Sequence, residues 1–322
     1  MTAPEDESQP RQHRPPTRAE IQARAQDLEA QVRATNDKIN ARTGRPIVLA
    51  IIVGIGLGAA LLVSLLIIKE LFLLFAAVLI VTVSLELSTA LRSSGRHVPR
   101  VPIVIGALLI VPASFFAIDA EAGLTREAGH WLATIAAILL VVVWRFVEQI
   151  TPSRRVAGAA LGRDLGASAF IVLYAMFLPS FFIVLTSHEG GQWWVLAALI
   201  VVVSVDTGAY VSGLSFGRHK MVPSISPNKT WEGFAGSVVA AVIAGVLCAW
   251  LMLQQPLWVG VIMGLAIVLT ATVGDLTESL IKRDLGIKDI STWLPGHGGL
   301  LDRLDSALPS AAAAYALFII FT

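Results

Sequence analysis

Acidic and basic residues are concentrated between Asp275 and Asp305, near the C-terminal end of the chain. The two segments that border and overlap this stretch, Leu257–Ile281 and Leu300–Phe321, are apolar enough to cross a membrane. Placing charged side chains in a bilayer costs free energy, so their presence there indicates a functional role. Carboxylates mixed with lysine and arginine are typical of sites that bind a divalent metal ion and phosphate groups.

One set of these residues has helical spacing. Asp275, Glu278, Ser279 and Lys282 occur at i, i+3, i+4 and i+7, so they share one face of a helix. At 1.5 Å per residue, Asp275 lies roughly 10 Å deeper in the membrane than Lys282. A carboxylate at that depth must face protein, water or metal rather than lipid. The spacing alone fits a metal ligand and a structural ion pair with Lys282 or Arg303 equally well.

A second set begins the last apolar segment. Asp302 and Asp305 are three residues apart and share a face at the start of a helix. Helix capping and dipole compensation, worth about 0.3–1 kcal/mol each, explain one such aspartate better than two. The preceding loop, Pro295–Gly299, contains three glycines that would allow close approach of a phosphate. His297, taken alone, is more typical of a hydrogen-bonding residue than of a metal ligand.

A third set lies upstream. Asp206 interrupts an apolar segment, and Lys229 follows in a polar loop, Ser226–Gly233. A lysine can meet a phosphate as a point charge, although an ordinary cytosolic-side lysine is the plain alternative. Glu86 lies within another apolar segment, and we expect a structural pairing there because no reactive residue surrounds it.

The composition indicates an integral membrane protein. Of the 322 residues 55% are hydrophobic, and the mean hydropathy is +0.73. We therefore expect an all-α, polytopic membrane protein with about nine transmembrane helices. The expected spans are Pro46–Ile68, Leu71–Leu91, Val101–Ile118, Trp131–Val147, Leu165–Leu185, Trp193–Gly213, Phe234–Leu253, Leu257–Ile281 and Leu300–Phe321. A net charge of +1 gives no overall field that would attract nucleic acid.

Lysine and arginine fall almost entirely on one side of these spans. Of 24 such residues, 22 lie in the N-terminal tail or follow even-numbered spans, and only Lys69 and Arg126 lie on the other side. The positive-inside rule then places the N-terminus in the cytosol and the C-terminus outside. The first 45 residues are polar, so we expect a partly disordered tail with a short helix over Thr17–Asn40 and no cleavable signal peptide.

Several of these motifs together resemble one family. Ser279-Leu-Ile-Lys-Arg283, Lys288-Asp289, His297-Gly-Gly299 and Asp302-Arg-Leu-Asp305 resemble, with the same spacing, the signature of the phosphatidate cytidylyltransferases, or CDP-diacylglycerol synthases. The motifs DTGAYVSG, FGRHK and SPNKTWEG further upstream are also similar to that family. The likeness covers roughly residue 165 to the C-terminus, whereas the first four spans match only in hydrophobic character.

The resemblance implies a reaction in which CTP and phosphatidate give CDP-diacylglycerol and pyrophosphate. It also implies Mg²⁺ as a cofactor and leaves room for a second, monovalent cation such as K⁺. The implied catalytic residues are Asp275, Asp302, Lys282, Arg283 and Lys229. The implied metal ligands are Asp275, Asp302, Asp305 and Asp289. The implied substrate-binding residues are Ser226, Asn228, Thr230, Ser279, Lys288, His297, Gly298, Gly299 and Arg303.

The same resemblance gives an expected organisation. A polar cytosolic tail over residues 1–45 precedes N-terminal transmembrane helices over 46–164 and a catalytic transmembrane region over 165–322. We expect a multi-pass protein of the inner (plasma) membrane, surrounded by membrane lipids, with its active site facing the cytosol. A homodimer is the family expectation.

Two other functions use similar residues. A CTP-dependent polyprenol or phytol kinase would also place metal-binding carboxylates near the membrane, but its alcohol acceptor would need a base. A transporter would line a pathway with buried charges, yet here the charges gather on one side and no inverted repeat is evident. The uninterrupted signature favours the cytidylyltransferase over both.

Overall fold

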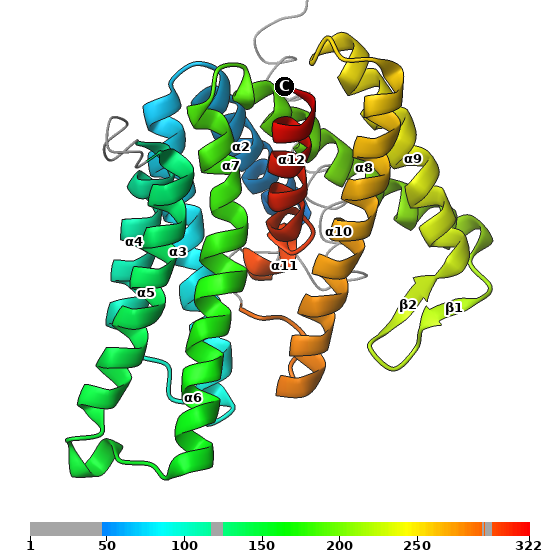
Figure 1. Cartoon of the computed structure of the whole chain (residues 1–322). Helices are drawn as coiled ribbons and strands as arrows, with labels where there is room; N and C mark the ends of the chain where they lie inside the picture. Colours follow the sequence, from blue (N-terminus) through cyan, green and yellow to red (C-terminus); the bar gives the residue numbers. More distant parts are fainter. Residues whose placement is uncertain (1–46, 117–124, 292, 294–297) are drawn as a thin grey trace, which may run out of the picture. The chain divides into compact units, whose positions relative to one another are not determined.

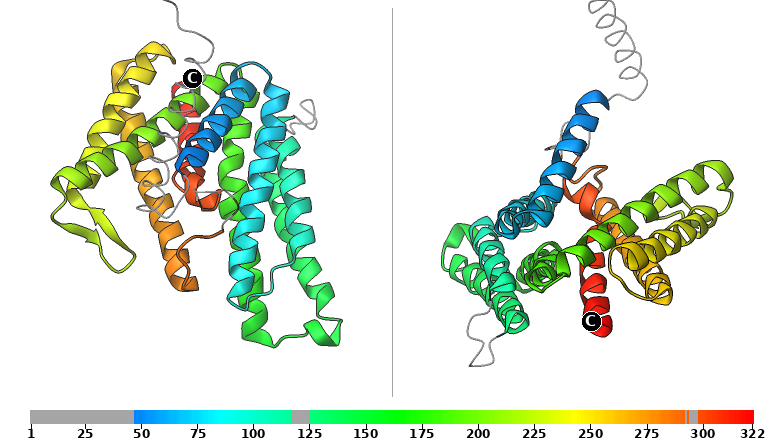
Figure 2. Two further views of the ribbon diagram at one scale, coloured as in Figure 1. Left: turned by 180° about the vertical axis from the view of Figure 1, so that it is seen from behind. Right: turned by 90° about the horizontal axis from the view of Figure 1, so that it is seen from above.

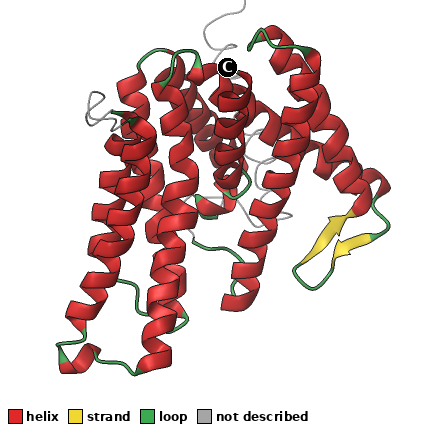
Figure 3. Cartoon of the chain, in the orientation of Figure 1, coloured by secondary structure: helices red, strands yellow, loops and turns green. Residues whose placement is uncertain are grey.

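The computed structural model describes residues 47–116, 125–291, 293 and 298–322. The predicted tail helix and His297 lie outside the described residues. The chain divides into two units, Met1–Val53 and Gly54–Thr322, and the description below concerns the second. Its described part consists of helices, a two-stranded sheet and connecting loops, which Figure 3 colours by type.

The helices are numbered from α2, and their order is labelled in Figure 1. The α-helices are α2 (Ile47–Leu66), α3 (Lys69–Ser93), α4 (Arg100–Phe115), α5 (Arg126–Glu148), α6 (Gly158–Ile171), α7 (Leu178–Ser187), α8 (Gly191–Phe216), α9 (Trp231–Leu251), α10 (Leu257–Leu285), α11 (Leu301–Leu304) and α12 (Ala307–Phe321). A 3₁₀ turn, η1 (Pro152–Arg154), precedes α6, and a π-helical stretch, η2 (Val172–Phe177), joins α6 to α7. The strands are β1 (Lys220–Val222) and β2 (Ser226–Thr230).

The helices confirm an all-α membrane protein. Each of the nine expected apolar segments overlaps helical residues; seven correspond to one α-helix each, the fifth to α6, η2 and α7, and the ninth to α11 and α12. In the described part of the chain, seven helices are long and apolar enough to cross a membrane. Two further apolar helices, Gly54–Leu66 and Arg100–Phe115, are shorter.

The helices of the second unit form two groups joined by α12. In one group α4 packs against α3, α5 and α7, and in the other α9 packs against α8 and α10. Helix α12 contacts α7, α8 and α10 and lies between the groups, as the views in Figures 1 and 2 show. Glycines allow α9 and α10 to approach closely, since a Cβ atom on Gly260 would lie 2.5 Å from the carbonyl oxygen of Gly245. The residues predicted to do chemistry lie on α10, on strand β2 of the segment between α8 and α9, and in the segment that leads from α10 through α11 to the start of α12.

A short hairpin, which the hydropathy pattern did not predict, connects α8 to α9. Strands β1 and β2 pair antiparallel, with Lys220 opposite Thr230 and an irregularity in the register. The hydroxyl of Thr230 accepts a hydrogen bond of 3.1 Å from the Gly233 amide and so caps α9. Lys229 therefore lies on a strand that leads directly into a capped helix, which limits where its side chain can reach.

A buried ionic network ties α5 to α6 away from the charged stretch. Arg145 is completely buried and donates to Oδ2 of Asp164 from Nε at 3.1 Å and from Nη2 at 2.8 Å. Asp164 also accepts from the His97 amide through Oδ1 at 2.8 Å. Arg145, one of the 22 basic residues assigned to one side of the spans, is thus a buried residue of α5.

Candidate active site

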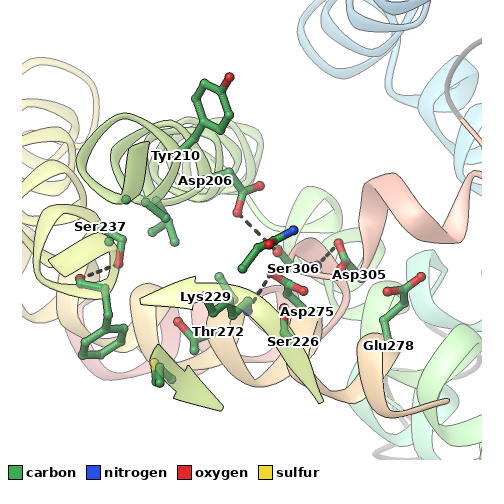
Figure 4. Close-up of a pocket in the computed structure, with 18 of the residues that line it drawn as sticks. Asp206, Tyr210, Ser226, Lys229, Ser237, Thr272, Asp275, Glu278, Asp305 and Ser306 are labelled. Atoms are coloured by element: carbon green, nitrogen blue, oxygen red, sulfur yellow. Dashed lines mark hydrogen bonds and ion pairs between the residues drawn. The ribbon is translucent and has the colours of Figure 1, made fainter. Parts of the chain in front are cut away.

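A cavity of about 460 Å³ lies among α8, the hairpin, α9, α10 and the segment that begins α11 and α12. Its lining includes polar or charged side chains from each of these elements, several of which Figure 4 shows pointing toward one another. They are Asp206, Tyr210, Ser226, Asn228, Lys229, Thr230, Ser237, Thr272, Asp275, Glu278, Lys282, Asp302, Arg303, Asp305 and Ser306. Three sets of residues separated widely in the sequence therefore meet in one cavity.

Asp275 and Lys229 form the first ion pair of the cavity. Oδ2 of Asp275 lies 2.6 Å from the Lys229 ammonium, and the Ser279 hydroxyl donates to Oδ1 at 3.3 Å. The two charged side chains retain 36% and 23% exposure, so a bound molecule could still reach them. The structural alternative from the sequence paired Asp275 with Lys282 or Arg303, but its ion-pair partner is Lys229 of the hairpin.

Asp302 is part of a second, more buried arrangement. The Lys282 ammonium lies 3.0 Å from Oδ1 of Asp302 and 2.5 Å from Oε2 of Glu278. The Asp302 and Glu278 side chains are only 8% and 2% exposed. Oε1 of Glu278 is buried and has no hydrogen-bond partner among the described residues. One ammonium thus compensates two buried carboxylates from neighbouring elements.

Backbone amides hold the other oxygen of Asp302. Its Oδ2 accepts from the amides of Gly299 at 2.8 Å and Ile290 at 3.1 Å. A Cβ atom on Gly299 would lie 2.8 Å from this oxygen, so a larger residue would press on the carboxylate. Gly298 has a φ of +84°, a conformation that glycine adopts without strain. The two glycines therefore shape the turn around Asp302.

Asp305 and Asp206 complete the acidic side of the cavity. A Cβ atom on Gly274 would collide with the carbonyl oxygen of Asp305, so this glycine lets α10 meet the start of α12. Oδ1 of Asp305 accepts from the Ser306 amide at 2.8 Å, and the Ser306 hydroxyl lies 3.5 Å from Asp206. Asp275 lies near enough to both Asp206 and Asp305 to repel them electrostatically.

The remaining predicted residues take different places. Ser226, Asn228, Thr230 and Arg303 line the cavity. Arg283 is outside the lining and donates from Nε to the carbonyl oxygen of Ile225 at 3.1 Å, so it contacts the turn of the hairpin. Lys288 is exposed and Asp289 half-buried, and neither belongs to the lining residues.

Comparison with known proteins identifies the family. A model of the cytidylyltransferase family matches residues 48–321. A protein of Mycobacterium bovis named phosphatidate cytidylyltransferase is 37% identical over 281 residues, which are 85% of this chain and 89% of that protein. Proteins with the same name from Mycobacterium leprae and Brucella suis are 36% and 35% identical, covering 86% and 67% of this chain and 88% and 73% of their own lengths. The chain belongs to the phosphatidate cytidylyltransferase family.

Family membership confirms the resemblance and extends it. The likeness inferred from the motifs began near residue 165, whereas the cytidylyltransferase family model begins at residue 48. The N-terminal helices therefore belong to the family region, although their sequences carry no short motif.

Glu278, Ser306 and Glu86 were not among the predicted site residues, although each lines the cavity or contacts the segment that carries Asp302. Glu278 was placed on the right helical face by its spacing, but its role as the second partner of Lys282 was not predicted. Ser306 lines the cavity, and a serine in an apolar segment gives no comparable signal. Glu86 does not line the cavity, but it accepts hydrogen bonds from the segment that carries Asp302.

Proposed function

We propose that this protein transfers the cytidylyl group of CTP to phosphatidate, giving CDP-diacylglycerol and pyrophosphate. The observation that carries the proposal is the pairing of Lys229 with Asp275 and of Lys282 with Asp302 in one cavity of a family member. Such alternating cations and carboxylates suit a reaction between two phosphate-bearing molecules.

The chemistry requires alignment more than proton transfer. A phosphate oxygen of phosphatidate attacks the α-phosphorus of CTP and forms the new P–O bond. The bond from the α-phosphorus to the bridging oxygen breaks, and pyrophosphate leaves with the electron pair. Since the attacking oxygen is already anionic, no dedicated base is needed, and the main barriers are charge repulsion and orientation.

The cationic side chains of the cavity address these barriers. Lys229, Lys282 and Arg303 reach it from three elements, β2, α10 and α11. In this assignment Lys229 and Lys282 hold the triphosphate and stabilise the leaving pyrophosphate. Ser226, Asn228 and Thr230 line the same wall and supply neutral hydrogen-bonding groups. Arg283 is assigned to the hairpin turn that it contacts.

The carboxylates fit a magnesium ion that shares its coordination with substrate. Among the described residues that line the cavity, five acidic side chains face three basic ones, a formal excess of two negative charges. No group of three or more metal-binding His, Cys, Asp or Glu side chains occurs in the described part of the chain. Mg²⁺ is commonly held by one or two carboxylates with waters and substrate phosphates, so this donor set suits it.

Asp275 and Asp305 are the carboxylates best placed to hold the ion in this proposal, with Asp302 beside them. When bound, Mg²⁺ would neutralise phosphate charge and polarise the reacting phosphoryl group. Asp289 lies outside the lining and is the weakest of the four proposed ligands. A second, monovalent cation such as K⁺ remains part of the proposal.

Orientation in the membrane is also proposed. Nine spans with a cytosolic N-terminus would place the hairpin and the end of α10 in the cytosol, where CTP is found. Single cysteines at exposed Ser215 and Glu189, in a Cys248→Ser background, can test this in intact cells with a membrane-impermeant thiol reagent. The cysteine at position 189 should react at once and that at 215 only after the membrane is opened; the reverse order would overturn the orientation. A plasma-membrane location and a homodimer complete the proposal.

The decisive experiment follows two labels from CTP. Purified protein in detergent is given phosphatidate, Mg²⁺ and CTP labelled at either the α- or the γ-phosphorus. A cytidylyltransferase places the α-label in lipid and releases the γ-label as pyrophosphate. A kinase acting on polyprenol or phytol would instead place the γ-label in lipid and release CDP. Absence of α-label in lipid from folded protein would refute the proposed function.

A further inference from the structure

Glu86 is a carboxylate buried in α3, outside the cavity. It is 1% exposed and lies in an apolar helix, where an uncompensated charge is costly. Its compensation comes from hydrogen bonds, because no ion pair joins it to a basic side chain within the described part of the structure. Oε1 accepts from the Ser291 hydroxyl at 2.5 Å and the Leu300 amide at 3.0 Å, and Oε2 accepts from the Leu301 amide at 2.9 Å.

These partners flank the residues that hold Asp302. The Gly299 amide donates to Asp302, and the next two amides along the chain donate to Glu86. A Cβ atom on Gly299 would lie 2.8 Å from Asp302 Oδ2 and 3.1 Å from Glu86 Oε2. The two carboxylates therefore hold the Gly299–Leu301 turn from two sides, one from α11 itself and one from α3.

We propose that Glu86 is a positioning residue for the reaction. By fixing the Gly299–Leu301 turn it sets the direction of the Asp302 carboxylate, and through Asp302 the position of the Lys282 ammonium. The inference rests on the proposed function, since it assigns α3 a part in aligning that site. It also gives the N-terminal helices a role in the reaction although they lie outside the charged motifs.

The test compares three variants with a matched control. Glu86→Ala removes all three acceptor contacts, Glu86→Gln keeps one acceptor oxygen, and Ser291→Ala removes one donor. Ser88→Ala is the control, because Ser88 is a fully buried residue of the same helix whose hydroxyl has no hydrogen-bond partner among the described residues. Each protein is purified as a monodisperse detergent complex, and kcat, KM for CTP and the Mg²⁺ concentration for half-maximal rate are measured.

We expect Glu86→Ala to lower kcat about 100-fold, since a displacement of roughly 1 Å at a reacting group can cost that much. Glu86→Gln and Ser291→Ala should lose less, and the control should match the wild type. A merely structural role would reduce the yield of folded protein but leave its kcat and Mg²⁺ requirement unchanged. A wild-type kcat in folded Glu86→Ala would overturn the inference. If Glu86→Ala does not fold, a wild-type kcat in both Glu86→Gln and Ser291→Ala would overturn it.

Hydrogen exchange gives a readout that does not depend on activity. The amides of Gly299, Leu300 and Leu301 should exchange faster in both Glu86 variants than in the wild type and in Ser88→Ala. Unchanged exchange would refute the anchoring even if the wild type made no CDP-lipid. An inactive wild type would instead count against the proposed function, so the two failures can be told apart.

Discussion

Replacing Lys282 with methionine tests how the buried charges of the cavity are held. The ammonium lies 2.5 Å from Glu278 and 3.0 Å from Asp302, whose side chains are 2% and 8% exposed. Lys282→Met would leave these two carboxylates close together without their shared cation. Removing one partner of a buried ion pair costs about 3–5 kcal/mol, and the 22% exposure of Lys282 places the expected loss of unfolding free energy near the lower end.

A second substitution separates stability from catalysis. Adding Glu278→Gln to Lys282→Met removes one of the two uncompensated charges, so we expect at least half of the lost unfolding free energy to return. The rate should not return, because the ammonium assigned to the triphosphate is still missing. By analogy with loss of one preorganised electrostatic donor, kcat should stay about 10²–10³-fold below the wild type in both variants.

Thermal unfolding in detergent and the α-label assay measure the two effects. For domains of about 150–250 residues, each kcal/mol of lost stability lowers Tm by roughly 2–4 °C, so a loss of about 3 kcal/mol corresponds to about 6–12 °C. Because this chain of 322 residues is larger, we expect a decrease toward the lower end of that range. Lys220→Met is the control, because Lys220 is an exposed lysine of the hairpin that does not line the cavity. The reasoning is wrong if Lys282→Met keeps the wild-type Tm, or if the double variant is no more stable than the single one.

Three further predictions use the same assays. Asp275→Asn should lower kcat about 100-fold or more at saturating Mg²⁺, while its partly exposed pair with Lys229 contributes only about 0–1 kcal/mol to stability; a near-normal rate would contradict the assignment. Asp164→Ala leaves Arg145 buried without its aspartate and should cost about 3–5 kcal/mol of unfolding free energy, with kcat of the folded fraction unchanged, and an unaltered Tm would count against it. Deleting Met1–Asn40 should preserve specific activity, and an inactive but correctly inserted truncation would show that the tail takes part in the reaction.

The helices were predictable because a membrane restricts the backbone so strongly. In hydrocarbon each amide and carbonyl must find its partner within the segment, so an apolar run of sufficient length becomes a helix. Each expected segment is therefore largely helical, although the helix ends differ: the fourth extends from Arg126 to Glu148 rather than from Trp131 to Val147. The hairpin was not predicted because three- and five-residue strands carry too little hydropathy signal to detect.

The residues that line the cavity were easier to predict from the sequence than the contacts between them. Helical spacing correctly placed Asp275 and Lys282 on one face, and more than half of the described residues that were predicted as site residues line the cavity. The partner of Asp275 is on a strand 46 positions earlier in the chain, and no local pattern connects the two. The partners of Glu86 could not be predicted for a similar reason. Backbone amides more than 200 residues away compensate its charge, and because every residue except proline has an amide, the amino-acid sequence does not show which ones do so.

The way these charges are compensated bears on where a phosphate site can exist in a membrane protein. Lys229 and Lys282 each pair with a carboxylate from another element, so the cavity assembles only when the hairpin, α10 and α11 are all in place. A lone lysine or aspartate that was equally buried would be costly, whereas each pair offsets much of that cost before any substrate binds. Small residues make the assembly possible, because Gly274 and Gly299 let backbone and carboxylate approach where a side chain would collide. Gly274 and Gly299 therefore have a structural role that does not depend on any contact with phosphate.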